Sequence, residues 1–423
     1  MRSFVVFAAN PRRLLLATAL ASAARVANAQ VDPHGPGPQS AASSRTSSVD
    51  APGTPEHAIV TTASAELAGY TDTDSVTVIT PSVAATVRDD LRGWSANGSY
   101  LADIVSAASV DIVSTASQRW TEVRHAGDLG ATYMPRSTGV AVDASASSEP
   151  DYVSFAAGGR LLLELADKTV NPTFGYAFAH DTAGKTGTPF SVYSQQLARH
   201  DLSAGLELVL DGATTFSLTG DALLERGDQK KPYRMLPVFK ADAVSKVPAG
   251  ASLALVNQTR QPGNTMESTP LERNRFALAG RLARRFSGST LVLSERLYAD
   301  DWGLLASTTE ARFVLDAGRR FLVWLHLRGH VQNGVSFWQR AYVGNVTSGN
   351  ADVPKYRTGD RELSPLVAGT AGAGVRWNFG RRSNPSSWGL VLQDDLVATH
   401  FENALYVTDR IGDLAILQLE VEL

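Results

Sequence analysis

The chain has 423 residues, a formal net charge of −3 and no cysteine. Neither disulfide bonds nor thiol chemistry can therefore contribute to its fold or activity. The mild acidity gives no reason to expect nucleic acid as a partner. After the first 29 residues, no apolar run is long enough for a transmembrane helix. If the protein spans a membrane it must do so as a β-barrel, because only helices and closed barrels satisfy every backbone polar group in lipid.

Residues 1–29 have the pattern of a secretory signal peptide. Arg2, Arg12 and Arg13 precede an apolar run from Leu14 to Ala24, and the segment closes with Ala27-Asn28-Ala29. The alternative is a retained helical anchor. Residues 30–57 are rich in Pro, Gly, Ser and Ala, and cannot bury enough apolar surface to fold. We expect a disordered periplasmic tail there, with a plug in a barrel lumen as the alternative.

From residue 58 to residue 423, short segments of alternating polarity repeat with turn residues between them. Clear examples are 201–210, 214–225 and 321–330. Asp211-Gly212 joins the first two and is a strong hairpin signal. The pattern predicts an all-β fold, a transmembrane antiparallel up-and-down β-barrel of about 16 strands, within a range of about 14–18.

Short and longer connections alternate along this region. Bacterial barrels show the same asymmetry, with short periplasmic turns and long external loops. It predicts that both termini lie in the periplasm of a Gram-negative cell, with the barrel in the outer membrane. The short turns lie near 89–93, 135–138, 167–172, 211–212, 287–289, 317–320 and 380–387. The longer connections are 70–74, 105–119, 147–151, 181–198, 228–273, 300–303, 333–362 and 401–406.

The last ten residues, Leu414 to Leu423, form a strand with one apolar and one charged face. Leu417 and Leu419 lie on the apolar face, and Glu420 and Glu422 on the other. This is typical of the closing strand of an outer-membrane barrel, although the usual terminal residue there is aromatic. We expect outer-membrane lipid and, through this strand, the barrel-assembly machinery as partners. A half-buried strand of a soluble sandwich is the alternative.

Glu295 breaks the alternation, because it falls on the apolar face of Leu291, Leu293 and Leu297. A carboxylate that faces lipid at mid-membrane is costly. Two explanations remain open: a bulge shifts the register at Ser294, or this end of the strand lies outside the membrane.

Charged side chains gather on the faces that would line the lumen. A wall of mixed charge is suited to guiding small polar or charged solutes, and a barrel of about 16 strands is wide enough for an aqueous channel. The alternative is that these groups pair across strands and only fill space. The lumen and constriction candidates on the strands are Arg275, Arg281, Arg285, Glu310, Arg312, His326 and Arg328.

Two of the long loops, and the top of a strand, carry dense runs of Arg, Asp and aromatic residues. These runs are 225–234, 336–342 and 357–363. We hypothesise that they fold inward or pack together into an ordered cap or constriction with paired charges; the alternative is an external mat of loops. The constriction candidates here are Arg340, Arg357, Asp360, Arg361 and Glu362.

No motif assembles a catalytic or metal site. His326 and His330 share a strand face without a third ligand, and Asp300-Asp301 and Asp394-Asp395 are better explained as loop-end or lumen acids than as rim calcium sites. A hydrolase at the rim would need a nucleophile beside a His–acid pair. We therefore expect no catalytic residue, no metal and no cofactor.

Several motifs along the chain resemble those of an uncharacterised family of Gram-negative outer-membrane β-barrel proteins, known only as a domain of unknown function. The resemblance implies location and fold, and supplies neither substrate nor catalytic residue. The motifs are Tyr176–Thr182, Gly187–Ser191, Glu225–Arg234, Val247–Ser252, Glu295–Asp300, Ser336–Tyr342, Arg357–Leu363 and Tyr406–Arg410.

The sequence thus predicts a porin-like channel or transporter for small polar or charged solutes in the outer membrane. The first alternative is a non-conducting barrel that serves as a scaffold or export partner for a periplasmic assembly. A rim-sited barrel hydrolase ranks third.

Overall fold

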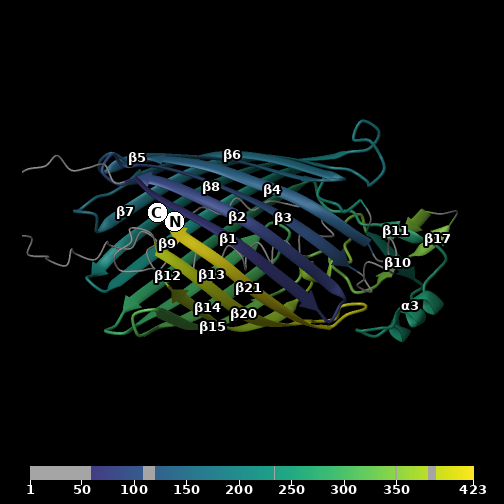
Figure 1. Ribbon diagram of the computed structural model, residues 1–423. Coiled ribbons are helices and arrows are strands. Elements are labelled where there is room, and N and C mark those ends of the chain that lie inside the picture. The colour runs from purple at the N-terminus through teal and green to yellow at the C-terminus, as the bar shows by residue number, and fades with distance from the viewer. Residues whose placement is uncertain (1–58, 108–119, 233, 348–349, 380–386) are drawn as a thin grey trace, which may run out of the picture.

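The computed structural model describes residues 59–107, 120–232, 234–347, 350–379 and 387–423. The expected signal peptide (1–29) and periplasmic tail (30–57) lie outside these residues. Among the described residues, no helix is long and apolar enough to cross a membrane. Sixteen strands close into a barrel in which each neighbouring pair is antiparallel (Figure 1). The predicted all-β, up-and-down barrel of about 16 strands is confirmed.

The strands follow one another around the barrel in chain order. They are β1 (Ile59–Asp72), β2 (Val76–Asp89), β3 (Trp94–Ala107), β4 (Trp120–Tyr133), β5 (Thr138–Glu149), β6 (Tyr152–Leu163), β7 (Val170–Ala183), β8 (Gln195–Asp211), β9 (Thr214–Gly227), β12 (Glu272–Arg285), β13 (Ser289–Asp300), β14 (Leu305–Ala317), β15 (Phe321–Gln332), β19 (Leu366–Asn378), β20 (Ser387–Phe401) and β21 (Asp409–Glu422).

The C-terminal strand closes the barrel, because β21 pairs with β1 as well as with β20. Leu417 lies opposite Leu67, and Val421 lies opposite Ala63. Closing the ring removes the two open edges that a sheet of this size would otherwise present to solvent or lipid. The strand read from Leu414 to Leu423 is therefore a barrel strand and not part of a sandwich.

Each strand separates its side chains onto two surfaces, since successive residues point to opposite faces. In β15, Phe321, Leu325 and Leu327 are exposed on the outer wall, whereas Trp324 and His326 are buried toward the interior. The outer wall is apolar along most strands, and the inner wall carries most of the charge. This is the arrangement expected for a barrel surrounded by lipid.

At the end opposite the C-terminus, the two longest loops fold together into a cap (Figure 1). Residues 228–271, between β9 and β12, contain β10 (Met235–Phe239), η1 (Val244–Lys246), α3 (Leu253–Thr259) and β11 (Asn264–Met266). Residues 333–365, between β15 and β19, contain β16 (Tyr342–Val343), β17 (Asn345–Thr347), β18 (Asn350–Asp352) and η2 (Arg361–Leu363). β10 pairs with β11 and, in parallel, with β16.

The cap has an apolar core of its own. Phe239, Val247 and Val256 are fully buried, and Tyr406 from the β20–β21 connection packs against them. Burial of these side chains stabilises the contact between loops that lie far apart in the sequence. The long loops therefore pack together as an ordered cap, the first of the two alternatives, and do not form a loose mat.

Glu295 lies on the outer wall with no bulge beside it. The registers of β13 with β12 and with β14 run through Ser294 and Glu295 without a shift. The Glu295 carboxylate accepts hydrogen bonds from Ser307 Oγ at 2.6 Å and Thr309 Oγ1 at 2.5 Å. The bulge explanation is wrong, and local hydroxyl donors supply the partners that lipid cannot.

Candidate functional site

A row of alternating charges crosses the inner wall from β8 to β15. Glu207, Arg281, Glu310 and Arg328 lie in one ladder of register partners. Ser217 lies between Glu207 and Arg281, and Ser294 lies between Arg281 and Glu310. Glu310 and Arg328 are direct register partners. Such a row presents both signs of charge to a solute at one level of the lumen.

Arg312 lies one step along the wall from this row, in a network that spans β14, β15 and β20. Its guanidinium stacks 4.7 Å from the centroid of the Trp324 ring. Trp324 Nε1 donates to Gln393 Oε1 at 3.3 Å, and Gln393 Nε2 donates to Asp395 Oδ2 at 2.7 Å. Asp395 Oδ1 lies 3.1 Å from His326 Nδ1. All five side chains are buried, so the network fixes their relative positions.

Two inward-facing glycines of β19 make room for this network. A Cβ at Gly374 would lie 2.2 Å from the Trp324 ring, and a Cβ at Gly372 would overlap the Asp395 carboxylate. Any larger residue at either position would displace the side chain that lies across it. The bare backbone of β19 thus lets Trp324 and Asp395 lie flat against the wall.

Other inward arginines are paired with carboxylates. Arg275 Nη2 lies 2.8 Å from Glu225 Oε2. Arg285 forms an ion pair with Asp316 at the end of the barrel that holds the C-terminus. Arg275 and Arg285 therefore pair across strands, as the alternative to a solute-guiding role supposes. Their charge is largely compensated within the wall.

The cap contains a buried charge cluster that joins its two loops. Asp360 from the second loop accepts hydrogen bonds from Lys231 and Arg234 of the first. Glu267 lies 3.4 Å from Arg234 and accepts from Thr358 Oγ1 at 2.5 Å. Burial lowers the pKa of Lys231, and Arg234 lowers it further, against the attraction of Asp360 and Glu267. Burial alone would raise the pKa of Asp360, but Arg234 and Lys231 hold it well below its usual range.

Two further ion pairs fasten the cap to the barrel rim. Arg361 Nη1 lies 2.6 Å from Asp74 Oδ2 in the β1–β2 turn, and Arg410 Nη1 lies 2.9 Å from Glu362 Oε1. Both guanidiniums also lie over the fully buried ring of Phe401, at 4.9 and 5.2 Å from its centroid. Cation–π contacts add to the ion pairs at such a site. We call these five residues the rim clamp.

Arg340 and Arg357 lie in the cap without joining the rim clamp or the buried cluster. Arg340 Nη1 is 3.4 Å from Asn403 Oδ1. Arg357 donates from Nε to the Met266 carbonyl oxygen at 2.8 Å and from Nη1 to the carbonyl oxygen of Pro354. Arg357 therefore supports the cap backbone, and within the described residues it forms no ion pair.

Eight of the twelve predicted site residues fall into two separate groups. Arg281, Glu310, Arg312, His326 and Arg328 come together on the inner wall, and Asp360, Arg361 and Glu362 come together in or under the cap. Gln393 was not predicted, and Asp395 was assigned only as a loop-end or lumen acid. The alternation in β20 could have found both, because Leu390, Leu392 and Leu396 mark its outer face.

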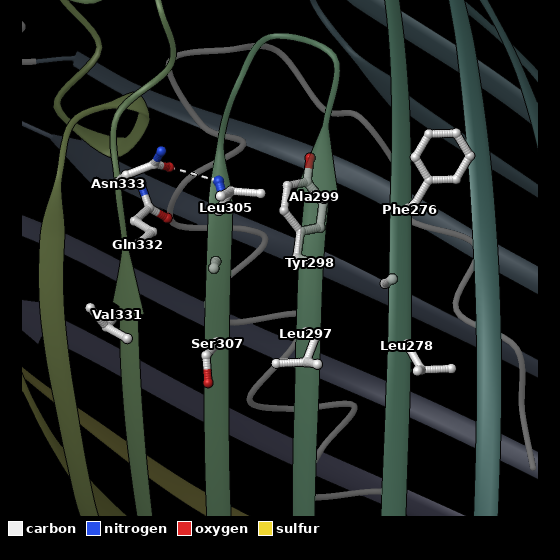
Figure 2. Close-up of a pocket in the computed structure, with 12 residues that line it drawn as sticks. Phe276, Leu278, Leu297, Tyr298, Ala299, Leu305, Ser307, Val331, Gln332 and Asn333 are labelled. Carbon is white, nitrogen blue, oxygen red and sulfur yellow. Dashed lines mark hydrogen bonds between the residues drawn. The ribbon is translucent and has the colours of Figure 1, made fainter.

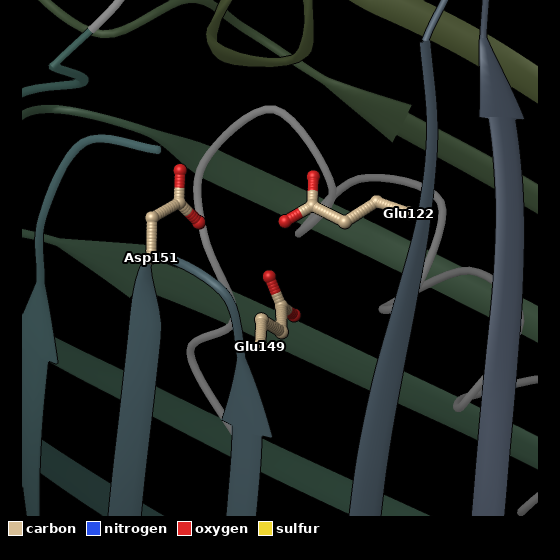
Figure 3. A group of neighbouring side chains, drawn as sticks. All are labelled: Glu122, Glu149 and Asp151. Carbon is tan, nitrogen blue, oxygen red and sulfur yellow. The ribbon is translucent and has the colours of Figure 1, made fainter. Parts of the chain in front are cut away.

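Three carboxylates meet near the cap end of the barrel, at the β5–β6 turn (Figure 3). Glu122, Glu149 and Asp151 each place one oxygen within 4.8 Å of the others. Thr186 Oγ1 donates to Asp151 Oδ2 at 2.9 Å. Hard divalent cations use oxygen ligands of this kind, but acidic groups often gather without an ion, and we assign no metal to the cluster.

A shallow depression lies on the outer wall beside Glu295 (Figure 2). Phe276, Leu278, Leu297 and Val331 line it, together with Ser307, which donates to Glu295. Its lining is mainly apolar, as is the rest of the lipid-facing wall.

Histidines meet acids or hydroxyls at five places in the described chain, but these contacts do not assemble a triad. Two of them join His125 to the Tyr100 hydroxyl and His200 to the Tyr176 hydroxyl. His326 pairs with Asp395 inside the barrel, and His400 Nδ1 lies 2.8 Å from Asp409 Oδ1 at the rim. In the described part of the chain, no hydroxyl bonds to either of these rings. His330 Nδ1 lies 2.7 Å from Thr308 Oγ1, but its other nitrogen faces the Gln332 amide and not an acid. Among the residues that the structure describes, these contacts do not bring a nucleophile, a base and an acid together.

Comparison with known proteins identifies the family. The family model described as "Protein of unknown function (DUF3570)" matches residues 73–388. The chain belongs to this family. The match covers most of the chain and confirms the resemblance seen in the motifs. No curated protein matches the chain.

Several solved structures of bacterial outer-membrane proteins are similar to it at low identity. OccK7 (OpdD) from Pseudomonas aeruginosa has 10% identity and a TM-score of 0.40 over 86% of this chain and 98% of its own. The siderophore receptor PirA from the same organism has 10% identity and a TM-score of 0.37, covering 81% of this chain. CdiB from Acinetobacter baumannii has 8% identity and a TM-score of 0.37 over 85% of this chain. The chain spans only 56% of the length of PirA and 60% of CdiB.

Proposed function

We propose that the protein is an outer-membrane barrel that passes small polar or charged solutes through its lumen. The observation that carries the proposal is the inward row of alternating charges, Glu207, Arg281, Glu310 and Arg328, in a closed barrel of sixteen strands. A barrel of this size has an interior wide enough for a channel. Fixed charges of both signs lower the cost of moving an ion or a polar solute along such a wall.

The outer wall supports the same proposal. Leu325, Leu327 and Leu417 are among its exposed apolar side chains, and water would leave them unfavourably hydrated. Outer-membrane lipid is the environment that covers them. We further propose that the barrel-assembly machinery recognises the C-terminal strand Leu414 to Leu423, as in other barrels that close through their last strand.

A non-conducting barrel is the second candidate, and one observation favours it. Tyr70, Val78, Leu414 and Ile416 form part of a buried apolar cluster on the inner faces of β1, β2 and β21. A water-filled channel does not require an apolar inner wall at that position. The cluster and the cap above the lumen are both compatible with a scaffold or an export partner for a periplasmic assembly.

Single-channel conductance separates the two candidates. The mature chain, Gln30 to Leu423, is refolded, checked for heat-modifiable migration on a gel, and added to a planar bilayer. We expect stable current steps that disappear when the protein is heat-unfolded before addition. A correctly folded barrel that gives no steps would contradict the channel and favour the scaffold.

A further inference from the structure

The arginines of the charged row and of the Trp324 network differ from the other inward arginines. Within the described chain, Arg281, Arg312 and Arg328 have no carboxylate oxygen within 4.0 Å. Many inward arginines elsewhere in the wall do have one: Arg124, Arg199, Arg273, Arg275, Arg285, Arg296 and Arg376. The three exceptions lie on β12, β14 and β15, within four consecutive strands, so their lack of pairing is concentrated in one part of the wall.

Arg312 is the most constrained of the three. Its side chain is only 4% exposed, yet its Nε and Nη1 groups have no hydrogen-bond acceptor in the described chain. A buried donor without an acceptor costs about 1–3 kcal/mol, and more when it is charged. Buried guanidinium groups are normally satisfied by protein, water or a bound anion. Arg312 is therefore a group built to receive an acceptor from outside the described chain.

The network holds Arg312 ready for that acceptor. The Trp324 ring supports one face of the guanidinium, and the hydrogen bond to Gln393 fixes the ring. Stacking uses the flat face of a guanidinium and leaves its N–H edges available. The Asp395 carboxylate is already engaged by Gln393 and His326, so it does not compete for those edges by direct contact.

The open donors of Arg312 set the charge of the ligand. The charges of the adjacent row balance one another, because Arg281 and Arg328 lie in one row with Glu207 and Glu310. Arg312 keeps two N–H groups without an acceptor in the described chain, and Asp395, the acid near it, is already engaged. One carboxylate supplies both acceptors, whereas a cation offers none.

We propose that Arg312, beside the row that holds Arg281 and Arg328, is a binding subsite for a small monocarboxylate on the inner wall of the barrel. A carboxylate offers the planar pair of oxygens that a guanidinium binds best. The inference deepens the proposed function, on which it rests for the entry of the anion, by naming the class of solute. Trp324 and Gln393 are positioning residues in this site.

Binding is measured without any current. Saturation-transfer NMR on the full mature chain, folded in detergent micelles, uses benzoate as the probe, with benzyl alcohol and benzylamine as neutral and cationic controls. We expect benzoate to bind more tightly than either control. Arg312→Gln should weaken benzoate binding about tenfold, the loss expected for one charge-assisted contact.

The matched control is Arg284→Gln. Arg284 lies on β12, the strand of Arg281, and carries the same charge as Arg312, but it faces outward and bonds to Thr214 Oγ1. The Arg284→Gln variant should bind benzoate as the natural chain does. Should Arg312→Gln fail to fold, Arg312→Lys keeps the charge but loses the planar fork, and should still bind benzoate more weakly.

The reversal potential in a salt gradient, measured in planar bilayers, separates this inference from the proposed channel. Benzoate binding that depends on Arg312, in a barrel that carries no current, would support the subsite and contradict the channel. A conducting barrel whose anion preference and benzoate affinity are unchanged in Arg312→Gln would overturn the subsite and leave the channel standing. Benzoate binding no tighter than that of benzyl alcohol would also overturn the subsite.

Discussion

Asp360 is a buried carboxylate on which the packing of two loops depends. It sits between Lys231 and Arg234, and all three side chains are largely enclosed by the cap. The attraction within such a cluster must offset the cost of removing three charges from water. The cluster therefore contributes more to the specificity of the loop contact than to net stability, and it is sensitive to the loss of any one member.

Replacing Asp360 with Asn should loosen the cap without unfolding the barrel. The change leaves two buried cations with less compensation, at a cost of about 3–5 kcal/mol. Hydrogen-exchange mass spectrometry should show faster exchange across 228–271, with the barrel strands unchanged. Asp242→Asn is the control, because Asp242 is an exposed acid of the same loop. Equal protection in the two variants would contradict the role of Asp360.

The lowered pKa of Asp360 determines how the cap should respond to acid. Its folded-state pKa is lowered, so its stabilising contribution is fully present above the unfolded pKa of about 4. That contribution is lost as the pH falls below this value toward the folded pKa. Hydrogen exchange of 228–271 should therefore accelerate below about pH 4 in the natural chain, relative to a barrel hairpin such as β8–β9, and much less in Asp360→Asn.

At the scale of elements, the rim clamp is the contact between cap and barrel most open to test. Arg361→Ala removes the ion pair with Asp74 and one of the two guanidiniums over Phe401. We expect faster hydrogen exchange in 333–365 and a larger or less interrupted conductance, because the cap is held less firmly over the lumen. Arg357→Ala, which loses only bonds to backbone carbonyls, should change conductance less. A larger change of conductance in Arg357→Ala than in Arg361→Ala would contradict the role of the rim clamp.

The barrel strands could be predicted from the sequence because each carries its own signal. Alternating polarity assigns the outer face, and short turns such as Asp211-Gly212 mark the hairpins, so strand number and direction follow from local pattern. The cap and the Arg312 network could not be derived in this way. The contact of Lys231 with Asp360, and that of Trp324 with Gln393, join segments far apart in the chain, and no local pattern encodes them.

For the molecule as a whole, Glu295 is an exception to the separation of an apolar outside from a charged inside. Replacing it with Leu should stabilise the barrel in lipid bilayers by about 1–2 kcal/mol, less than the gain expected at an outward Lys or Arg. Urea unfolding in vesicles measures the change. Glu272→Leu, at the solvent-exposed start of β12, should show no such gain. Destabilisation by Glu295→Leu would instead indicate that the hydrogen bonds from Ser307 and Thr309 outweigh the cost of the outward carboxylate.

The cap also imposes an order of events on assembly. Hairpins of the barrel pair neighbours in sequence, but the parallel pairing of β10 with β16 joins loops that are separated by the four strands β12 to β15. Contacts between distant segments form late, because the chain between them must be placed first. A newly formed barrel must therefore pass through a stage in which the two cap loops have not yet docked. For the proposed channel, the time needed to dock the cap sets how long the lumen stays open at this end.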